Sequence, residues 1–218
     1  MAKALILTIV FGFLLLSIPI IFEPQIAKSA TATDEVVITL AVSSEVTVSD
    51  CADFTMTGSP IPGITGGTAT GDCTWTVTTN DTAGFSMSIK ASSSPALATG
   101  SYSFADYTEA NSGTPDYTWS VAASASEFGY TVEPATAADT VQAFLDDGAS
   151  ACNTGSTNGV NTCWYHTTTT DYTIINRSSE TGANGEDEVV RFKAEVGSSS
   201  FQEAETYQAT ITVTVTTN

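Results

Sequence analysis

The chain contains few basic side chains. Its 218 residues include 6 Lys and Arg against 24 Asp and Glu, and a single histidine, His166. Nucleic-acid binding depends on Lys and Arg that neutralise phosphates, so this composition excludes a nucleic-acid partner. Solubility explains such acidity most simply, and a high-salt habitat or calcium binding are the alternatives.

Catalytic motifs are also missing. A Ser-His-Asp triad would have to use His166, and no serine lies in a Gly-x-Ser-x-Gly turn. A carboxylate pair of the glycosidase kind would meet through the fold, so spacing does not test it. We expect a non-catalytic protein with no cofactor, and a secreted hydrolase that uses acidic residues is the enzymatic alternative.

Long amphipathic helical patterns are absent after residue 32. The one helical candidate is 135–145, of one or two turns, which Asp146-Asp147-Gly148 would end. Most other segments alternate apolar and polar residues at period two, as strands do. The clearest cases are 36–42, 85–89, 188–196 and 207–215. A turn at 80–84 predicts that the strand containing Trp75 and Val77 forms a hairpin with 85–89.

Many short strands separated by turn residues predict an all-β protein. We expect one elaborated domain over residues 33–218, an antiparallel β-sandwich of immunoglobulin-like or jelly-roll-like type. A barrel is the weaker alternative.

The N-terminus is typical of an export signal. Lys3 is followed by an uncharged run from Ala4 to Phe22 and then by the small residues of 27–32. Cleavage fits best after Ala32, and after Ser29 next. An uncleaved anchor is the alternative, because a run of this length could just span a bilayer. Cleavage after residue 32 leaves 186 residues with four basic and 23 acidic side chains. We therefore expect an extracellular or cell-surface protein that meets the membrane only through this segment.

All four cysteines follow the predicted signal: Cys51, Cys73, Cys152 and Cys163. An exported chain favours disulfides. The pairs Cys51–Cys73 and Cys152–Cys163 close the shortest loops, although spacing does not exclude a crossed pairing. The second pair would staple a surface loop, 149–161. A zinc site is the rival interpretation, but it would require closer cysteines or more histidines.

Two acidic spots are candidates for calcium, Asp146-Asp147 and Glu186-Asp187-Glu188. Neither has the ordered Asp-x-Asp-x-Asp-Gly loop of a dedicated calcium site, so we expect solvated turns. Asn80 and Asn176 head sequons for glycosylation, which matter only in a host that has the machinery.

Two sets of residues are candidates for binding. Trp164 and Tyr165 stand beside the stapled loop, where aromatic side chains often meet sugars or proteins. After signal cleavage, a strand with apolar residues at Val36, Ile38, Leu40 and Val42 would lie directly at the new N-terminus. It could pair within its own domain, or it could add to the open sheet edge of a neighbouring copy.

Two stretches resemble the WxL domain of bacterial wall-associated proteins. Gly71-Asp72-Cys73-Thr74-Trp75-Thr76-Val77 is similar to the first Trp-x-Leu strand of that family, with Val77 at the Leu place. The segment 207–215 is similar to the closing strand, with Val213 in place of the family's tryptophan and Val215 at the Leu place. The resemblance implies noncovalent attachment to the cell wall. More loosely, the Thr-rich chain resembles secreted fibre and pilus subunits.

These patterns favour a non-catalytic structural protein: a wall-layer component, an adhesin or a filament subunit. Its partner would be a further copy of the chain, in a homopolymer, or a cell-wall glycan. A secreted carbohydrate-binding module that uses Trp164 and Tyr165 is the alternative.

Overall fold

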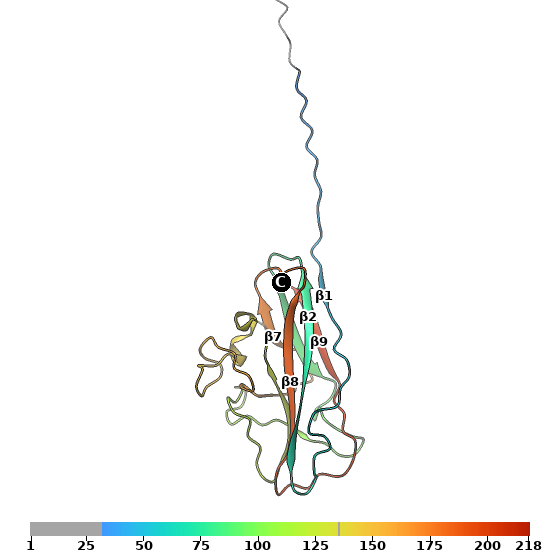
Figure 1. The fold of residues 1–218 in the computed structure, drawn as a ribbon, viewed down its shortest axis with the longest axis vertical. Coiled ribbons are helices and arrows are strands. Elements are labelled where there is room, and N and C mark those ends of the chain that lie inside the picture. The colour runs from blue at the N-terminus through green and yellow to red at the C-terminus, as the bar shows by residue number, and fades with distance from the viewer. Residues whose placement is uncertain (1–31, 135) are drawn as a thin grey trace, which may run out of the picture. The chain divides into compact units, whose positions relative to one another are not determined.

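The computed structural model describes residues 32–134 and 136–218. These residues form two β-sheets, and their only helical elements are two short 3-10 turns (Figure 1). The predicted all-β class is confirmed. Val42–Asn218 form one compact unit, and residues 32–41 do not belong to it. The predicted signal peptide lies outside the described residues, except for Ala32.

Nine strands are assigned within the described residues. They are β1 (Val46–Val48), β2 (Gly67–Thr79), β3 (Phe85–Ala91), β4 (Ala105–Asp106), β5 (Ser126–Val132), β6 (Tyr165–His166), β7 (Tyr172–Arg177), β8 (Glu186–Val196) and β9 (Ile211–Thr217). The larger sheet has the order β1-β2-β8-β5-β4, with β6 also on β5, and the smaller sheet has the order β7-β3-β9. Except for the parallel pair β4 and β5, neighbouring strands are antiparallel.

The long strands β2 and β8 form the centre of the larger sheet (Figure 1). They pair without interruption from Gly67 opposite Val196 to Val77 opposite Glu186. Alternate residues of β8 from Glu188 to Val196 are buried, as the period-two pattern predicts. This inward face and the inward face of β3 contribute to one hydrophobic core.

The predicted hairpin between β2 and β3 is wrong. The turn at residues 80–84 is present, but β2 pairs with β1 and β8 whereas β3 pairs with β7 and β9. The turn therefore carries the chain from one sheet to the other. Both strands have one buried face, so alternation alone fits either pairing.

Strand β7 has no clear signal in the sequence. The register of β7 against β3 shifts between Met87 and Ser88, so that Ile175 pairs with Met87 and Thr173 with Ser88. Ile174 is the extra residue of this bulge. Ile174 and Ile175 are consequently both buried, and two buried neighbours break the alternation by which strands are found in a sequence.

The helical candidate is two separate 3-10 turns, Ala137–Asp139 and Gln142–Phe144. Val141 between them is extended, which prevents a continuous α-helix. Within the described residues, no helix is long and apolar enough to cross a membrane.

Candidate binding groove

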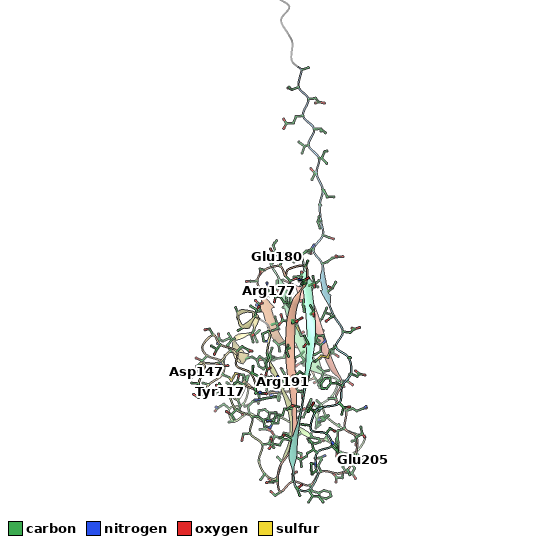
Figure 2. The ribbon with its side chains drawn as sticks, in the orientation of Figure 1. Tyr117, Asp147, Arg177, Glu180, Arg191 and Glu205 are labelled. Atoms are coloured by element: carbon green, nitrogen blue, oxygen red, sulfur yellow. A yellow bond between two sulfur atoms is a disulfide. The ribbon has the colours of Figure 1, made fainter. Side chains whose placement is uncertain are left out.

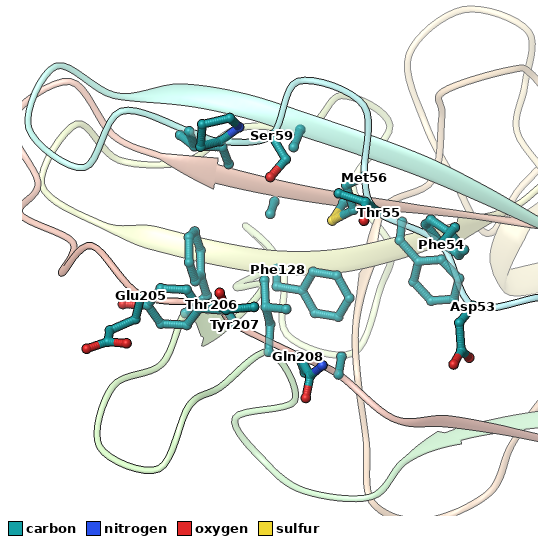
Figure 3. A pocket seen from close by; sticks show the side chains of 18 of the residues that line it. Asp53, Phe54, Thr55, Met56, Ser59, Phe128, Glu205, Thr206, Tyr207 and Gln208 are labelled. Atoms are coloured by element: carbon teal, nitrogen blue, oxygen red, sulfur yellow. The ribbon is translucent and has the colours of Figure 1, made fainter.

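A groove of about 1070 Å³ lies along one side of the compact unit. Its floor is the inner face of the larger sheet, with side chains of β2, β5 and β8 that include Cys73, Phe128 and Phe192. One wall is the segment 51–61, and the opposite wall is the segment 202–211 (Figure 3). Many of its lining residues are apolar or aromatic, but the surface that the groove presents is as much polar as apolar, and Asp53, Glu203 and Glu205 supply negative charge.

The first wall is tied to the floor by a disulfide. Cys51 is bonded to Cys73 of β2, and Thr57 forms a two-way backbone bridge with Thr70. Between these points the chain leaves the sheet edge, and the ring of Phe54 lies over Gly71. A Cβ built on Gly71 would stand 2.2 Å from that ring. Gly71 thus allows Phe54 to enter the groove, where its ring centroid is 6.4 Å from that of Phe192.

The second wall is an unpaired backbone edge. Gln208 and Ala98 exchange backbone hydrogen bonds, and Ser92 donates to the carbonyl of Thr210. Opposite residues of antiparallel strands alternate between bonded and non-bonded pairs. In this stretch the even-numbered residues bond inward to the smaller sheet.

The odd-numbered positions, 207, 209, 211 and 213, therefore direct their backbone groups away from the smaller sheet. Within the described residues, β9 pairs only with β3, and β1 lies near β9 without pairing with it. The side chains of Tyr207, Ala209 and Ile211 line the groove. Residues 207–213 thus combine an apolar row with a row of free N–H and C=O groups.

The N-terminal segment is a second exposed apolar row. Residues 32–45 have no assigned strand. The side chains of Val36, Ile38, Leu40 and Val42 are 78%, 87%, 87% and 79% exposed. Exposed large apolar side chains at period two are unusual, because an unpaired strand of this kind is a template for association.

The two aromatic residues proposed as a binding surface are buried. Trp164 is 1% exposed and Tyr165 is 6% exposed, so neither presents an open ring face to a ligand, and this expectation is corrected. The two neighbours enter different clusters: Tyr165 joins the main core, and Trp164 joins a smaller cluster with Tyr107 and Trp119. The ammonium of Lys193 lies 5.5 Å from the Trp164 ring, and burial lowers the pKa of this lysine.

His166 is held by a carboxylate. Its ring Nδ1 lies 2.6 Å from an oxygen of Glu109, and its backbone N–H donates to the same oxygen. The hydrogen bond to Glu109 raises the pKa of His166, and burial of the ring lowers the pKa in part. His166 is in β6, against β5, so this pair fixes a strand beside the edge of the larger sheet.

Asp146 organises the stapled loop. This residue is 1% exposed, and its carboxylate accepts hydrogen bonds from the N–H groups of Gly148 and Gly159 and from the hydroxyls of Thr157 and Thr162. Burial would raise its pKa, but these bonds hold it below the usual value. The donors occupy the oxygens that a calcium ion would need. No group of three or more His, Cys, Asp or Glu side chains suited to a metal is found among the described residues.

The sequence predicted a solvated turn at the second acidic spot, and this prediction is wrong. Glu186, Asp187 and Glu188 begin β8, and Glu188 is 1% exposed. Burial, and next the nearby charge of Asp139, raise the pKa of Glu188 to about 8. Arg177 offsets this only in part, because it is paired with Asp139 at 2.6 Å and with Glu186 at 3.4 Å.

The basic side chains of the compact unit all have internal partners. Lys90 pairs with Asp171, and Arg191 pairs with Asp72 and Glu133. Arg177 and Lys193 are engaged as described above. The surface of the compact unit is therefore governed by unpaired carboxylates, in agreement with the composition.

The predicted disulfide pairing is confirmed: Cys51–Cys73 and Cys152–Cys163 are both formed. All four cysteine sulfurs are in disulfide bonds, so they are not zinc ligands. Both sequon asparagines are exposed. The side-chain amide of Asn80 accepts from the N–H of Glu45 and donates to the carbonyl of Ser43.

Comparison of this chain with protein-family models, with curated proteins and with solved structures finds no match.

Proposed function

We propose that this protein is a non-catalytic extracellular structural protein, a subunit of a surface fibre or layer that acts through contacts between proteins. The observation that carries the proposal is the groove. It places an open groove, with both apolar side chains and polar groups, beside the free backbone edge of 207–213. An edge of this kind associates readily with another strand unless it is covered.

The geometry suits a strand better than a small molecule. Small-molecule sites combine an apolar pocket with a few convergent polar groups that fix orientation. Among the charged residues that line this groove, Asp53 and Glu205 lie at its two walls, where Figure 3 shows their carboxylates away from the Phe128 ring. The polar groups in a regular row are instead backbone groups, which recognise another backbone.

The two sheets with a shared core support an antiparallel β-sandwich, of immunoglobulin-like or jelly-roll-like type, as the finer description of the fold. Export is proposed on the N-terminal pattern together with the two disulfides, since disulfides persist in oxidising compartments. An adhesin would use the same surface for a foreign partner.

Electron microscopy and sedimentation velocity of the secreted protein test this proposal. We expect polymers or ordered layers whose fraction grows with protein concentration. A protein that stays monomeric at every concentration and salt level would contradict the subunit proposal.

Cell-wall glycan is a second candidate partner, favoured by one observation. Both stretches that resemble the WxL domain reach this groove: Trp75 lines it from β2, and Tyr207 and Ile211 line it from the second wall. Co-sedimentation with purified wall material, lost in Trp75→Ala but kept in a Trp119→Phe control, would favour wall attachment over self-assembly.

A further inference from the structure

We infer that the groove is an acceptor site for the N-terminal segment of a second copy of this chain, residues 36–42, which adds as a strand to the edge of residues 207–213. The inference rests on the proposed structural function and names its partner and its site. Three features of the two segments match.

The first match is length and periodicity. The donor segment has seven residues, with apolar side chains at 36, 38, 40 and 42, and the acceptor edge has free backbone groups at 207, 209, 211 and 213. Because the side chains of a strand alternate between its two faces, one face of the donor carries Val36, Ile38, Leu40 and Val42. The other face carries Val37, Thr39 and Ala41. Seven paired residues span about 23 Å.

The second match is the chemistry of the surfaces. The exposed row of the donor is wholly aliphatic. The groove that would receive it has apolar side chains that are exposed or only partly buried, namely Phe54, Met56, Ile61, Trp75 and Ile211. An added donor strand would cover its own apolar row and the apolar side chains of the groove. It would also form backbone hydrogen bonds with the free edge of residues 207–213. Main-chain hydrogen bonds give affinity in this mode of recognition, and the alternate side chains give specificity.

The third feature concerns where the chain enters the compact unit. The amide of Asn80 bonds Ser43 and Glu45 at the end of β2. The groove instead reaches Gly63, beyond the start of β2, where Gln202 donates its N–H to the Gly63 carbonyl. A segment returning to its own groove would have to reverse direction within residues 43–45, which those bonds hold. A second copy needs no such reversal.

These positions also define the direction of the donor. The two ends of the compact unit are separated by the 13 residues of β2; Arg177 and Glu180 lie at one end and Glu205 at the other (Figure 2). A donor antiparallel to 207–213 places Val42 beside Tyr207, so that its own domain lies beyond the Gly63 end. Each added copy then presents a fresh groove. Such a head-to-tail contact generates a filament unless the rotation between successive copies closes a ring.

A binding experiment tests the acceptor site directly. The protein starting at Ser43 keeps the compact unit except for Val42 and has no donor. We expect a synthetic peptide of residues 33–44 to bind it and to change the fluorescence of Trp75, which lines the groove. A peptide with Leu40→Asp should bind about 10- to 100-fold more weakly, the effect of losing one buried aliphatic side chain. The matched control, Thr39→Asp, carries the same charge on the opposite face and should bind within about threefold of the unchanged peptide.

Assembly of the secreted protein tests the second copy. We expect Ile38→Asp to abolish polymers and Thr39→Asp to leave them. Ala209→Pro removes an N–H that makes no backbone bond within the described residues, so it should block the acceptor edge. Its melting temperature should stay near that of the unchanged protein. Mixing Ile38→Asp, which has an intact groove, with Ala209→Pro, which has an intact donor, should give a dimer that does not grow.

The outcomes separate this inference from the proposed function. Polymers that persist in Ile38→Asp would overturn strand donation and leave the structural function standing. Peptide binding without any polymer of the secreted protein would support the acceptor site and contradict the subunit proposal. A third outcome is a monomer that binds the peptide when residues 36–42 are deleted and does not bind it when they are present. This result would show that the segment 36–42 occupies the groove of its own chain, and it would overturn donation by a second copy. If Ala209→Pro does not fold, the peptide pair at Leu40 and Thr39 still decides the question.

Discussion

Glu188 should make the protein less stable as the pH rises. Its side chain is 1% exposed on the inner face of β8, and one of its carboxylate oxygens has no hydrogen-bond partner among the described residues. The ordinary pKa of 4.5 describes this group in the unfolded chain, whereas the folded protein raises it to about 8. The folded state therefore binds the proton more tightly. This contribution is complete below pH 4.5 and disappears as the pH rises to 8.

The size of the effect follows from the two pKa values. Each pH unit between them costs about 1.4 kcal/mol of folding free energy. Ionisation of this one group should therefore lower stability by about 3 kcal/mol between pH 4.5 and 7, and by about 4 kcal/mol between pH 4.5 and 9. Glu188→Gln keeps the shape of the side chain and cannot ionise. It should be close to the unchanged protein at pH 4.5 and more stable by these amounts at higher pH.

Urea unfolding at pH 4.5, 7 and 9 measures this difference. Glu180→Gln is the matched control, because Glu180 is exposed and its replacement should leave the pH profile parallel to that of the unchanged protein. The unchanged protein also contains His166, but comparison of two variants at the same pH cancels that contribution. A Glu188→Gln variant whose advantage did not grow between pH 4.5 and 9 would refute a buried, protonated Glu188.

Three further predictions concern other sites. Asp146→Ala should destabilise the stapled loop by about 3 kcal/mol, because it removes the carboxylate that accepts hydrogen bonds from Gly148, Thr157, Gly159 and Thr162; hydrogen exchange at Gly148 and Gly159 would detect the opening, and unchanged protection would contradict it. Gly71→Ala should displace the Phe54 ring and lower the free energy of unfolding by about 1–3 kcal/mol, which a lower melting temperature would report. In a protein that already carries Phe54→Ala, the same change should cost much less stability. An equal loss of stability in both backgrounds would show that Gly71 does not make room for the Phe54 ring. The pKa of His166 measured by NMR should exceed 6.5 and fall in Glu109→Gln, so the pair should stabilise the fold below pH 6.5 and lose that effect as the pH rises through the raised value.

Local features of the chain were predictable because they depend on neighbours in sequence. The disulfides Cys51–Cys73 and Cys152–Cys163 close short loops, and proximity favoured those pairs over the crossed ones. The alternation over 188–196 identified β8 with its correct inward face, because one buried side imposes period two. The apolar row at residues 36–42 was equally visible, and its partner stays a proposal.

Pairing between strands was harder to predict, because a period-two pattern says which face is buried and not which strand lies beside it. Phe85–Ala91 looked like the return strand of a hairpin, yet it belongs to the other sheet. Residues 207–210 looked like part of the last strand, yet β9 begins at Ile211. The bulge at Ile174 conceals β7 for a related reason, since one extra residue cancels the alternation.

The candidate site shows the same division. The all-β class, a preferred disulfide pairing, the scarcity of positive charge and the apolar alternation of 36–42 could be read from the chain alone, because composition and alternation are local properties. The burial of Trp164 and Tyr165 and the position of Glu188 in the core became known only from the folded structure. The folded structure also brought segments 51–61 and 202–211 together as the walls of one groove. Burial and grooves depend on contacts between residues far apart in the chain, and no pattern along the sequence records those contacts.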